Sequence, residues 1–265
     1  MPSRNNLKDF DLVNLNTSPN NRRLLNLVRK NYRNKGSKKN IVISIAGAHG
    51  VGKSTIFNLL KKEVKDNPKF KFFPERYVKK TPFPFGSKDK QIAFRSEMHF
   101  LQQFIRRNKN VINFDNRYNG RILILDRTPI CVLVYSKSLY LKEKDFNLIE
   151  DMYNSVKWRE DYIFYLTAET DTILKRIITR GTLDKRRKEW NEYEREYLKQ
   201  ILGFYNELLL QGEISDKVIT LNTERKTADD ILETIKKRIK ELTGYSFKKH
   251  IESVKAQMNI MKFIK

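Results

Sequence analysis

The stretch Ile41-Val-Ile-Ser-Ile-Ala-Gly-Ala-His-Gly-Val-Gly-Lys-Ser-Thr55 decides the fold of this chain. It begins with apolar and small residues and runs into the pattern G-x-x-x-x-G-K-S between Gly47 and Ser54. An apolar run follows from Ile56. An apolar strand, a glycine-rich loop and a helix start in this order form the context that a P-loop requires. The sequence therefore predicts a nucleoside triphosphate site.

Each part of this loop has a physical role toward a triphosphate. Glycines let consecutive backbone N–H groups turn inward around a phosphate, and the following helix adds the positive end of its dipole. Lys53 is expected to reach the β- and γ-phosphates as a point charge, and Ser54 to offer its hydroxyl to Mg²⁺. The predicted nucleotide-binding residues are Gly47, Ala48, His49, Gly50, Val51, Gly52, Lys53, Ser54 and Thr55.

The composition is that of a globular chain, with 39% hydrophobic residues among 265. No apolar run approaches the roughly 20 residues of a membrane span, and the N-terminus lacks the layout of a secretion signal. A single cysteine, Cys131, excludes an intrachain disulfide and a thiolate-cluster zinc site. We therefore expect a cytoplasmic protein without a membrane partner.

Positive charge is concentrated at the two ends of the chain. The formal net charge is +23, of which residues 1–40 carry +8 and residues 244–265 carry +4. Such ends are compatible with a nucleic-acid partner, because clustered lysines and arginines release counterions from phosphates. A lysine-rich background explains the same charge, and we favour it because no nucleic-acid-reading motif accompanies it.

The order of apolar segments predicts the architecture. After the strand from Ile41, four short apolar strand candidates alternate with longer helical patterns: Phe70–Phe73, Arg121–Leu125, Tyr162–Leu166 and Lys217–Leu221. This alternation predicts an α/β fold, a five-stranded parallel sheet with helices on both faces and ligands at the carboxyl ends of the strands. We expect a basic extension over residues 1–38, a P-loop domain over 39–243 and an amphipathic helix over 244–265.

Two acid–arginine pairs follow predicted strands. Asp126 and Arg127 end the third strand, where Asp126 would hold Mg²⁺ or its water shell and Arg127 would contact a phosphate. Glu75 and Arg76 follow the second strand, where Glu75 would accept a substrate proton or hold the metal and Arg76 would hold an acceptor phosphate. The structural alternative for Asp126 and Arg127 is an ion pair at a strand end. For Glu75 and Arg76 it is a solvated pair in a loop.

Residues 87–110 show a strong helical pattern. Its predicted buried stripe is Phe94, Met98, Leu101 and Ile105. Polar residues line the neighbouring face, where they suit either a nucleoside base and a phosphate or plain solvent. The substrate-binding candidates taken from this face are Arg95, Gln102, Gln103 and Arg106.

A basic segment, about residues 180–190, joins two further helical patterns and includes Arg180 and Arg186. In a chain that contains a P-loop, a basic segment that follows the fourth strand is typical of a helical lid. A lid would exclude water and bring cations to the transferring phosphoryl group. A solvated charged surface is the simpler alternative.

These motifs together resemble the thymidylate kinase and deoxynucleoside kinase superfamily of P-loop kinases. The match runs from about Ile41 to Leu242. It rests on the P-loop, Asp126-Arg127, Arg180-Gly-Thr-Leu-Asp-Lys185 and the helical stretch from Tyr197 to Leu208. The resemblance implies ATP and Mg²⁺ as donor, a nucleoside or nucleoside monophosphate as acceptor, and a fold compatible with a homodimer. By analogy it assigns the base and metal roles to Glu75 or Asp126, phosphate contact to Arg127, and stabilisation of the transition state to the lid residues Arg180 and Arg186. With Lys53 of the P-loop, these are the predicted catalytic residues.

The acceptor stays open at this point, because Asp126-Arg127-Thr128 lies between the strand-end patterns of the two branches. The favoured function is transfer of the γ-phosphoryl group to a dTMP-like monophosphate or a deoxynucleoside. A polynucleotide 5′-kinase or nucleic-acid-binding NTPase using the basic ends is one alternative. A nucleotide-dependent switch without an acceptor is another.

Overall fold

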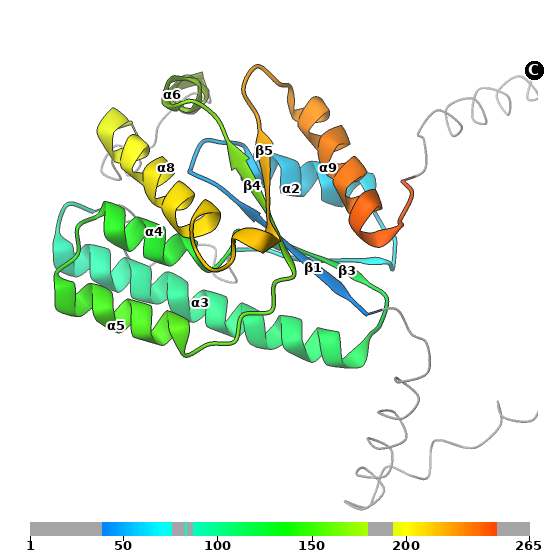
Figure 1. Cartoon of the computed structure of the whole chain (residues 1–265), viewed down its shortest axis with the longest axis horizontal. Helices are drawn as coiled ribbons and strands as arrows, with labels where there is room; N and C mark the ends of the chain where they lie inside the picture. Colours follow the sequence, from blue (N-terminus) through cyan, green and yellow to red (C-terminus); the bar gives the residue numbers. More distant parts are fainter. Residues whose placement is uncertain (1–38, 76–82, 84–86, 180–192, 248–265) are drawn as a thin grey trace, which may run out of the picture.

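Five short apolar segments form one fully parallel sheet in the computed structural model, which describes residues 39–75, 83, 87–179 and 193–247 (Figure 1). The strand order is β2-β3-β1-β4-β5. Every predicted strand is present, although β3 and β5 are each shifted by one residue toward the C-terminus. The strands are β1 (Ile41–Ala46), β2 (Phe70–Phe73), β3 (Ile122–Asp126), β4 (Tyr162–Thr167) and β5 (Val218–Asn222).

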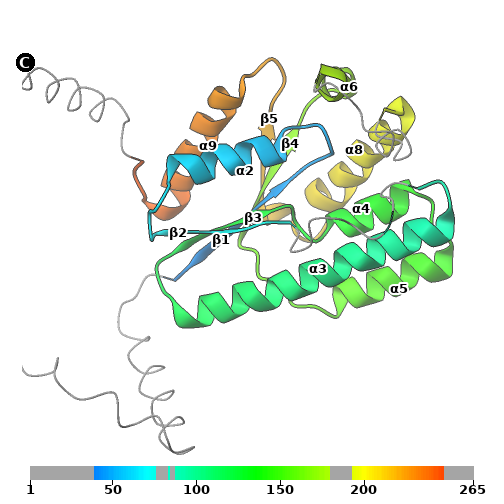
Figure 2. The same cartoon turned by 180° about the vertical axis from the view of Figure 1, so that it is seen from behind.

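Helices cover both faces of this sheet, which explains why the central strands are buried along nearly their whole length instead of alternating between buried and exposed residues. Figure 2 shows α2 and α9 on one face and α3, α4, α5 and α8 on the other. All five residues of β3 are buried. The helices are α2 (Lys53–Glu63), α3 (Lys90–Arg117), α4 (Cys131–Ser138), α5 (Glu143–Asn154), α6 (Thr170–Thr179), α8 (Arg195–Leu210) and α9 (Ala228–Thr243), with a short 3₁₀ turn at Ser215–Lys217.

Helix α3 differs from its prediction in both length and orientation. It begins at Lys90, after Asp89, whose side chain accepts hydrogen bonds from the backbone amides of Gln91 and Ile92, and it continues to Arg117. Of the predicted buried stripe, only Leu101 is fully buried, whereas the other three residues pack against the core and stay partly exposed. The predicted stripe lies to one side of the face that is buried in the structure. Polar residues occupy part of that buried face, and a prediction based on hydrophobicity places such residues in solvent.

The chain after α9 packs against the edge strand β2. Gly244 ends α9 with a positive φ of 70°, and Tyr245 then packs edge-on against Phe70 with ring centroids 4.9 Å apart. The Tyr245 hydroxyl accepts a 2.6 Å hydrogen bond from Asn67. Residues 245–247 are not helical, so the predicted helix does not begin at 244, and the rest of that segment lies outside the described residues.

Candidate active site

The P-loop has the conformation that its glycines predict. Gly47, Gly50 and Gly52 have φ values of 137°, 81° and 110°, in the region that disfavours residues with a Cβ. A Cβ on Gly47 would lie 2.4 Å from the carbonyl oxygen of Leu166. The first turn of α2 has no side-chain cap at Gly52, so its amide groups are available to an anion.

Lys53 lies inside the loop rather than in solvent. It is 5% exposed, and its ammonium donates a 2.8 Å hydrogen bond to the carbonyl oxygen of Ala48. Burial, together with the positive charge of Arg127, lowers the pKa of Lys53 to about 7. A phosphate bound in the loop would supply the opposite charge that this buried ammonium needs.

Two tyrosines contact the loop from the neighbouring helices. The backbone N–H of His49 donates to the hydroxyl of Tyr135 in α4 at 3.2 Å, and the His49 ring stacks on Tyr197 of α8 with centroids 6.2 Å apart. His49 therefore anchors the loop to two helices, and its amide already has an acceptor within the protein.

The acidic and basic residues at the ends of β2 and β3 meet beside the P-loop. Arg127 Nε lies 2.9 Å from Glu75 Oε1, and both side chains are largely buried. Asp126 is 9% exposed, and burial raises its pKa despite the charge of Arg127. The charges of Glu75, Asp126 and Arg127 all influence Lys53. Parallel strands thus bring these predicted residues to one edge of the sheet.

Two buried charged residues of α3 were not among the predicted site residues. Glu97 is 1% exposed, and burial raises its pKa to about 8, with Arg127 and Glu75 as its charged neighbours. Its Oε1 atom has no hydrogen-bond partner among the described residues. Arg107 is also 1% exposed. The sequence carries a signal for the burial of Glu97, which lies four residues from both Ala93 and Leu101. Residues so spaced share a helix face, so Glu97 lies on the same face as two apolar residues.

The predicted substrate-binding residues of α3 lie on different faces of the helix. Arg95, Gln102 and Arg106 are exposed, so the structure does not bring them into the buried cluster. Gln103 is 3% exposed, but it lies six positions from Glu97 and hence about 120° around the helix. Packing of α3 against α4 and α5 sets this orientation. A direct role of these four residues in substrate binding stays a prediction.

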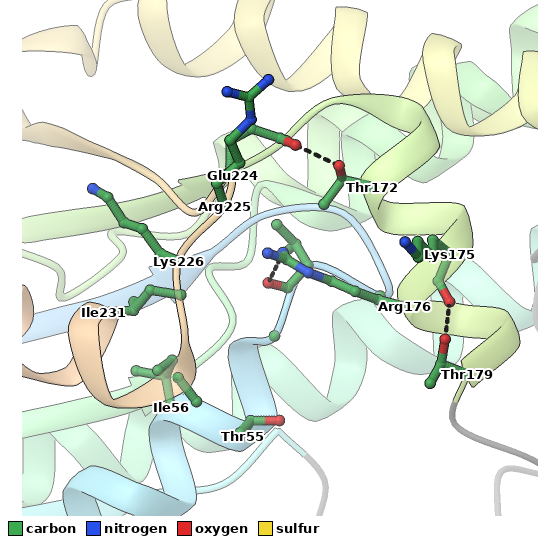
Figure 3. Close-up of a pocket in the computed structure, with 14 residues that line it drawn as sticks. Thr55, Ile56, Thr172, Lys175, Arg176, Thr179, Glu224, Arg225, Lys226 and Ile231 are labelled. Atoms are coloured by element: carbon green, nitrogen blue, oxygen red, sulfur yellow. Dashed lines mark hydrogen bonds between the residues drawn. The ribbon is translucent and has the colours of Figure 1, made fainter.

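A cavity of about 650 Å³ opens on the outer side of the P-loop. Its walls come from the loop, from α6 and from the connection between β5 and α9 (Figure 3). Arg176 of α6 ties these parts together, since its guanidinium donates to the Thr223 hydroxyl at 2.8 Å and to the Thr223 carbonyl at 2.6 Å. Glu224 accepts a hydrogen bond from Thr172 across the same cavity.

The residues present fit a magnesium ion that is shared with phosphates. Asp126 Oδ1 is buried and has no hydrogen-bond partner in the described part of the chain, while the Ser54 side chain at the start of α2 is exposed. Within residues 39–75, 87–179 and 193–247, no cluster of three or more His, Cys, Asp or Glu side chains is suited to a metal. Mg²⁺ beside a nucleotide usually takes only one or two protein oxygens, so this arrangement suffices.

Some predicted residues cannot be placed. Arg76, Arg180 and Arg186 lie outside the described residues, as does the predicted lid over 180–190. Among the helices that are described, none is long and apolar enough to cross a membrane.

Comparison with known proteins identifies the family. A family model of deoxynucleoside kinases matches residues 43–244. The chain belongs to the deoxynucleoside kinase family. It is therefore a nucleoside kinase, a phosphotransferase acting on deoxynucleosides, and the resemblance seen in its sequence is confirmed.

Curated relatives of this kinase come from bacteria. The deoxyguanosine kinase of Lactobacillus johnsonii is 24% identical over 222 residues, which cover 76% of this chain and 93% of the relative. The deoxyadenosine/deoxycytidine kinase of Bacillus subtilis is 25% identical over 195 residues, which cover 67% and 84% respectively.

Solved structures confirm the fold of this deoxynucleoside kinase. The deoxyadenosine kinase of M. mycoides with dCMP and dCDP bound has a TM-score of 0.60 at 23% identity, and the match covers 76% of this chain and 100% of that one. The thymidylate kinase of Candida albicans has a TM-score of 0.54 at 17% identity, covering 78% and 93%. The predicted P-loop kinase fold with a five-stranded parallel sheet is thus confirmed.

Proposed function

We propose that this kinase transfers the γ-phosphoryl group of ATP, in the presence of Mg²⁺, to a hydroxyl group of a deoxynucleoside. The observation that carries this proposal is the buried pair of Glu75 and Arg127 beside Lys53. It combines a proton acceptor and a phosphate-binding cation at the edge of the sheet where the P-loop lies.

The acceptor side depends on Glu75, Arg127 and Glu97. Glu75 accepts the proton of the attacking hydroxyl, and Arg127 stabilises the negative charge on the transferring group. Arg127 also holds the Glu75 carboxylate in place at 2.9 Å. The buried Glu97, whose pKa of about 8 keeps it mostly protonated at neutral pH, offers one donor and one acceptor to a polar group of the deoxynucleoside.

The donor side depends on the P-loop and the cavity next to it. The loop amides and Lys53 hold the β- and γ-phosphates, and the 650 Å³ cavity accepts the nucleoside part of ATP. Ser54 and Asp126 are the residues that would hold Mg²⁺, which when bound neutralises charge on the phosphate oxygens. The M. mycoides deoxyadenosine kinase, which has the same fold, has been solved with bound dATP and with bound dCTP, and this supports a nucleoside triphosphate as a ligand of the fold.

Several predictions from the sequence remain proposals. Arg180 and Arg186 would bring positive charge from the lid, and Arg76 would contact the acceptor. A dTMP-like monophosphate and the 5′ end of a polynucleotide are the alternative acceptors. Homodimer formation and nucleic-acid binding at the basic ends also remain predictions. The family membership of the chain favours a kinase over a switch without an acceptor.

Transfer of label from γ-labelled ATP tests the proposal. The acceptor panel contains the four deoxynucleosides, dTMP and a 5′-hydroxyl oligonucleotide, with Lys53→Ala as the inactive variant. Lys61→Ala, an exposed lysine on the same helix, is the matched control. We expect label on a deoxynucleoside, lost in Lys53→Ala and on chelation of Mg²⁺, and retained in Lys61→Ala. Label on dTMP or the oligonucleotide alone would replace the proposed acceptor.

A further inference from the structure

The residue that contacts Glu75 has an unusual backbone. Arg127 follows the last residue of β3 directly and has a φ of 69°. This left-handed conformation is disfavoured for a residue that carries a Cβ, so something in its surroundings must maintain it. The conformation matters because it decides where the Arg127 side chain points when it leaves the strand end.

The side chain of Arg107 supplies this support from α3. Its Nη1 donates to the carbonyl oxygen of Asp126, and its Nη2 donates to the carbonyl oxygen of Arg127 at 2.8 Å. These two carbonyls belong to the peptide planes on either side of the Arg127 Cα atom. Since the orientations of the two planes define φ and ψ of the residue between them, one guanidinium holds both torsion angles.

Arg107 itself is held firmly in place. It is 1% exposed, and its guanidinium carbon lies 4.7 Å from the centre of the Phe104 ring. A guanidinium presents its N–H groups in a rigid planar fork, whereas a lysine ammonium presents a single point from which N–H bonds diverge. The buried fork therefore suits the two adjacent carbonyls in a way that lysine cannot reproduce.

We propose that Arg107 is a positioning residue for phosphoryl transfer, which locks the left-handed backbone of Arg127 and thereby directs its guanidinium toward Glu75 and the transferring group. This inference rests on the proposed function. Arg107 acts through Arg127 and does not touch the substrate. A purely structural alternative exists, because the charge of Arg107 also acts on the buried carboxyl of Glu160 and favours its ionised form.

The variant Arg107→Lys separates these roles, since it keeps the charge near Glu160 but loses the fork. The matched control is Arg159→Lys, at a partly buried arginine that pairs with Asp115 and Asp161 near the opposite ends of the strands. We expect kcat in Arg107→Lys to fall by about 10²-fold, with ATP affinity and Tm close to those of Arg159→Lys. Transfer at the wild-type rate would overturn the proposal.

A double-mutant cycle tests whether the effect passes through Arg127. In an Arg127→Gln background the guanidinium that Arg107 directs is absent, so adding Arg107→Lys should lower kcat by less than about threefold. Full additivity of the two substitutions would contradict the proposed coupling, because it would show that Arg107 acts independently of Arg127.

A second measurement does not depend on activity. In ¹⁵N-arginine-labelled protein, the Nε–H of Arg127 is identified by its loss in Arg127→Gln, and its exchange with solvent reports the contact with Glu75. Arg107→Lys should speed this exchange by at least about tenfold, whereas Arg159→Lys should not. Unchanged exchange would overturn the positioning role, even if the proposed deoxynucleoside acceptor proved wrong.

Discussion

Arg127 Nε and Glu75 Oε1 lie 2.9 Å apart, although 52 positions of sequence separate the two residues. The pairing of β2 with β3 brings them together, because Phe73 lies beside Leu125 and the two charged residues follow at the same distance along each strand. Both side chains are mostly buried, so their mutual attraction is stronger than it would be in water. The candidate site is thus a product of strand register.

Replacing Glu75 with Gln should remove the proton acceptor while preserving the shape of the side chain. We expect kcat for the deoxynucleoside to fall by about 10²–10⁴-fold, with little change in the Kd for ATP. Steady-state kinetics and calorimetry measure the two effects. Glu63→Gln, in an ion pair at the far end of α2, is the control. A Glu75→Gln enzyme with more than half of the wild-type kcat would rule out this residue as the base.

Glu97 should make the free energy of unfolding depend on pH. Its pKa of about 8 in the folded protein lies above its ordinary value of 4.5 because the group is buried. The protonated form is favoured by folding, so the stabilisation is complete below pH 4.5 and is lost as the pH rises through 8. The loss is at most about 5 kcal/mol, since one pKa unit is worth about 1.4 kcal/mol.

The variant Glu97→Gln tests this pH dependence, because an amide cannot ionise. Urea unfolding at about pH 5 and about pH 8.5 should show that the variant gains stability relative to the wild type as the pH rises. Glu213→Gln, at an exposed position, should follow the wild type. Parallel curves for the wild type and Glu97→Gln would show that Glu97 is not the group responsible.

Two glycine substitutions should have opposite effects on stability. Gly47→Ala places a Cβ 2.4 Å from the Leu166 carbonyl oxygen and strains a φ of 137°, so it should destabilise the fold by about 1–3 kcal/mol and weaken ATP binding. Gly203 lies inside α8 with nothing within 4 Å of the added methyl group, so Gly203→Ala should stabilise by about 0.5–1 kcal/mol. Thermal unfolding of both variants measures the difference, and equal shifts in Tm would contradict it.

Arg176→Met should weaken the donor site specifically. Loss of the two hydrogen bonds to Thr223 leaves the bonds that Glu224 accepts from Thr172 and from the Glu169 amide as the remaining links between α6 and the connection between β5 and α9. The wall of the cavity beside the P-loop is therefore held less firmly. We expect the Kd for ATP to rise about tenfold, which corresponds to about 1.4 kcal/mol, while the KM for the deoxynucleoside at saturating ATP changes little. Calorimetry and kinetics check this, with the exposed Arg238→Met as control. An unchanged Kd for ATP would show that Arg176 has no part in the donor site.

The sequence by itself determined the P-loop, the five strands and the sheet edge at which the site forms. Gly47 to Ser54 form one uninterrupted segment, and the conformation of such a segment follows from its own glycines, strand and helix start. Asp126, Arg127 and Glu75 could be placed near one another because parallel strands present their carboxyl ends at a single edge.

Only the tertiary structure decided which side of α3 faces the site. The periodicity of apolar residues predicted a buried stripe through Phe94 and Met98. In the structure, packing of α3 against α4 and α5 buries Glu97 and Arg107 and leaves Arg95 exposed. Buried polar residues are identified by partners distant in the sequence, such as the carbonyl oxygens that Arg107 contacts at the end of β3. A local pattern carries no information on such partners, because the rotation of a helix is set by the surfaces against which it packs.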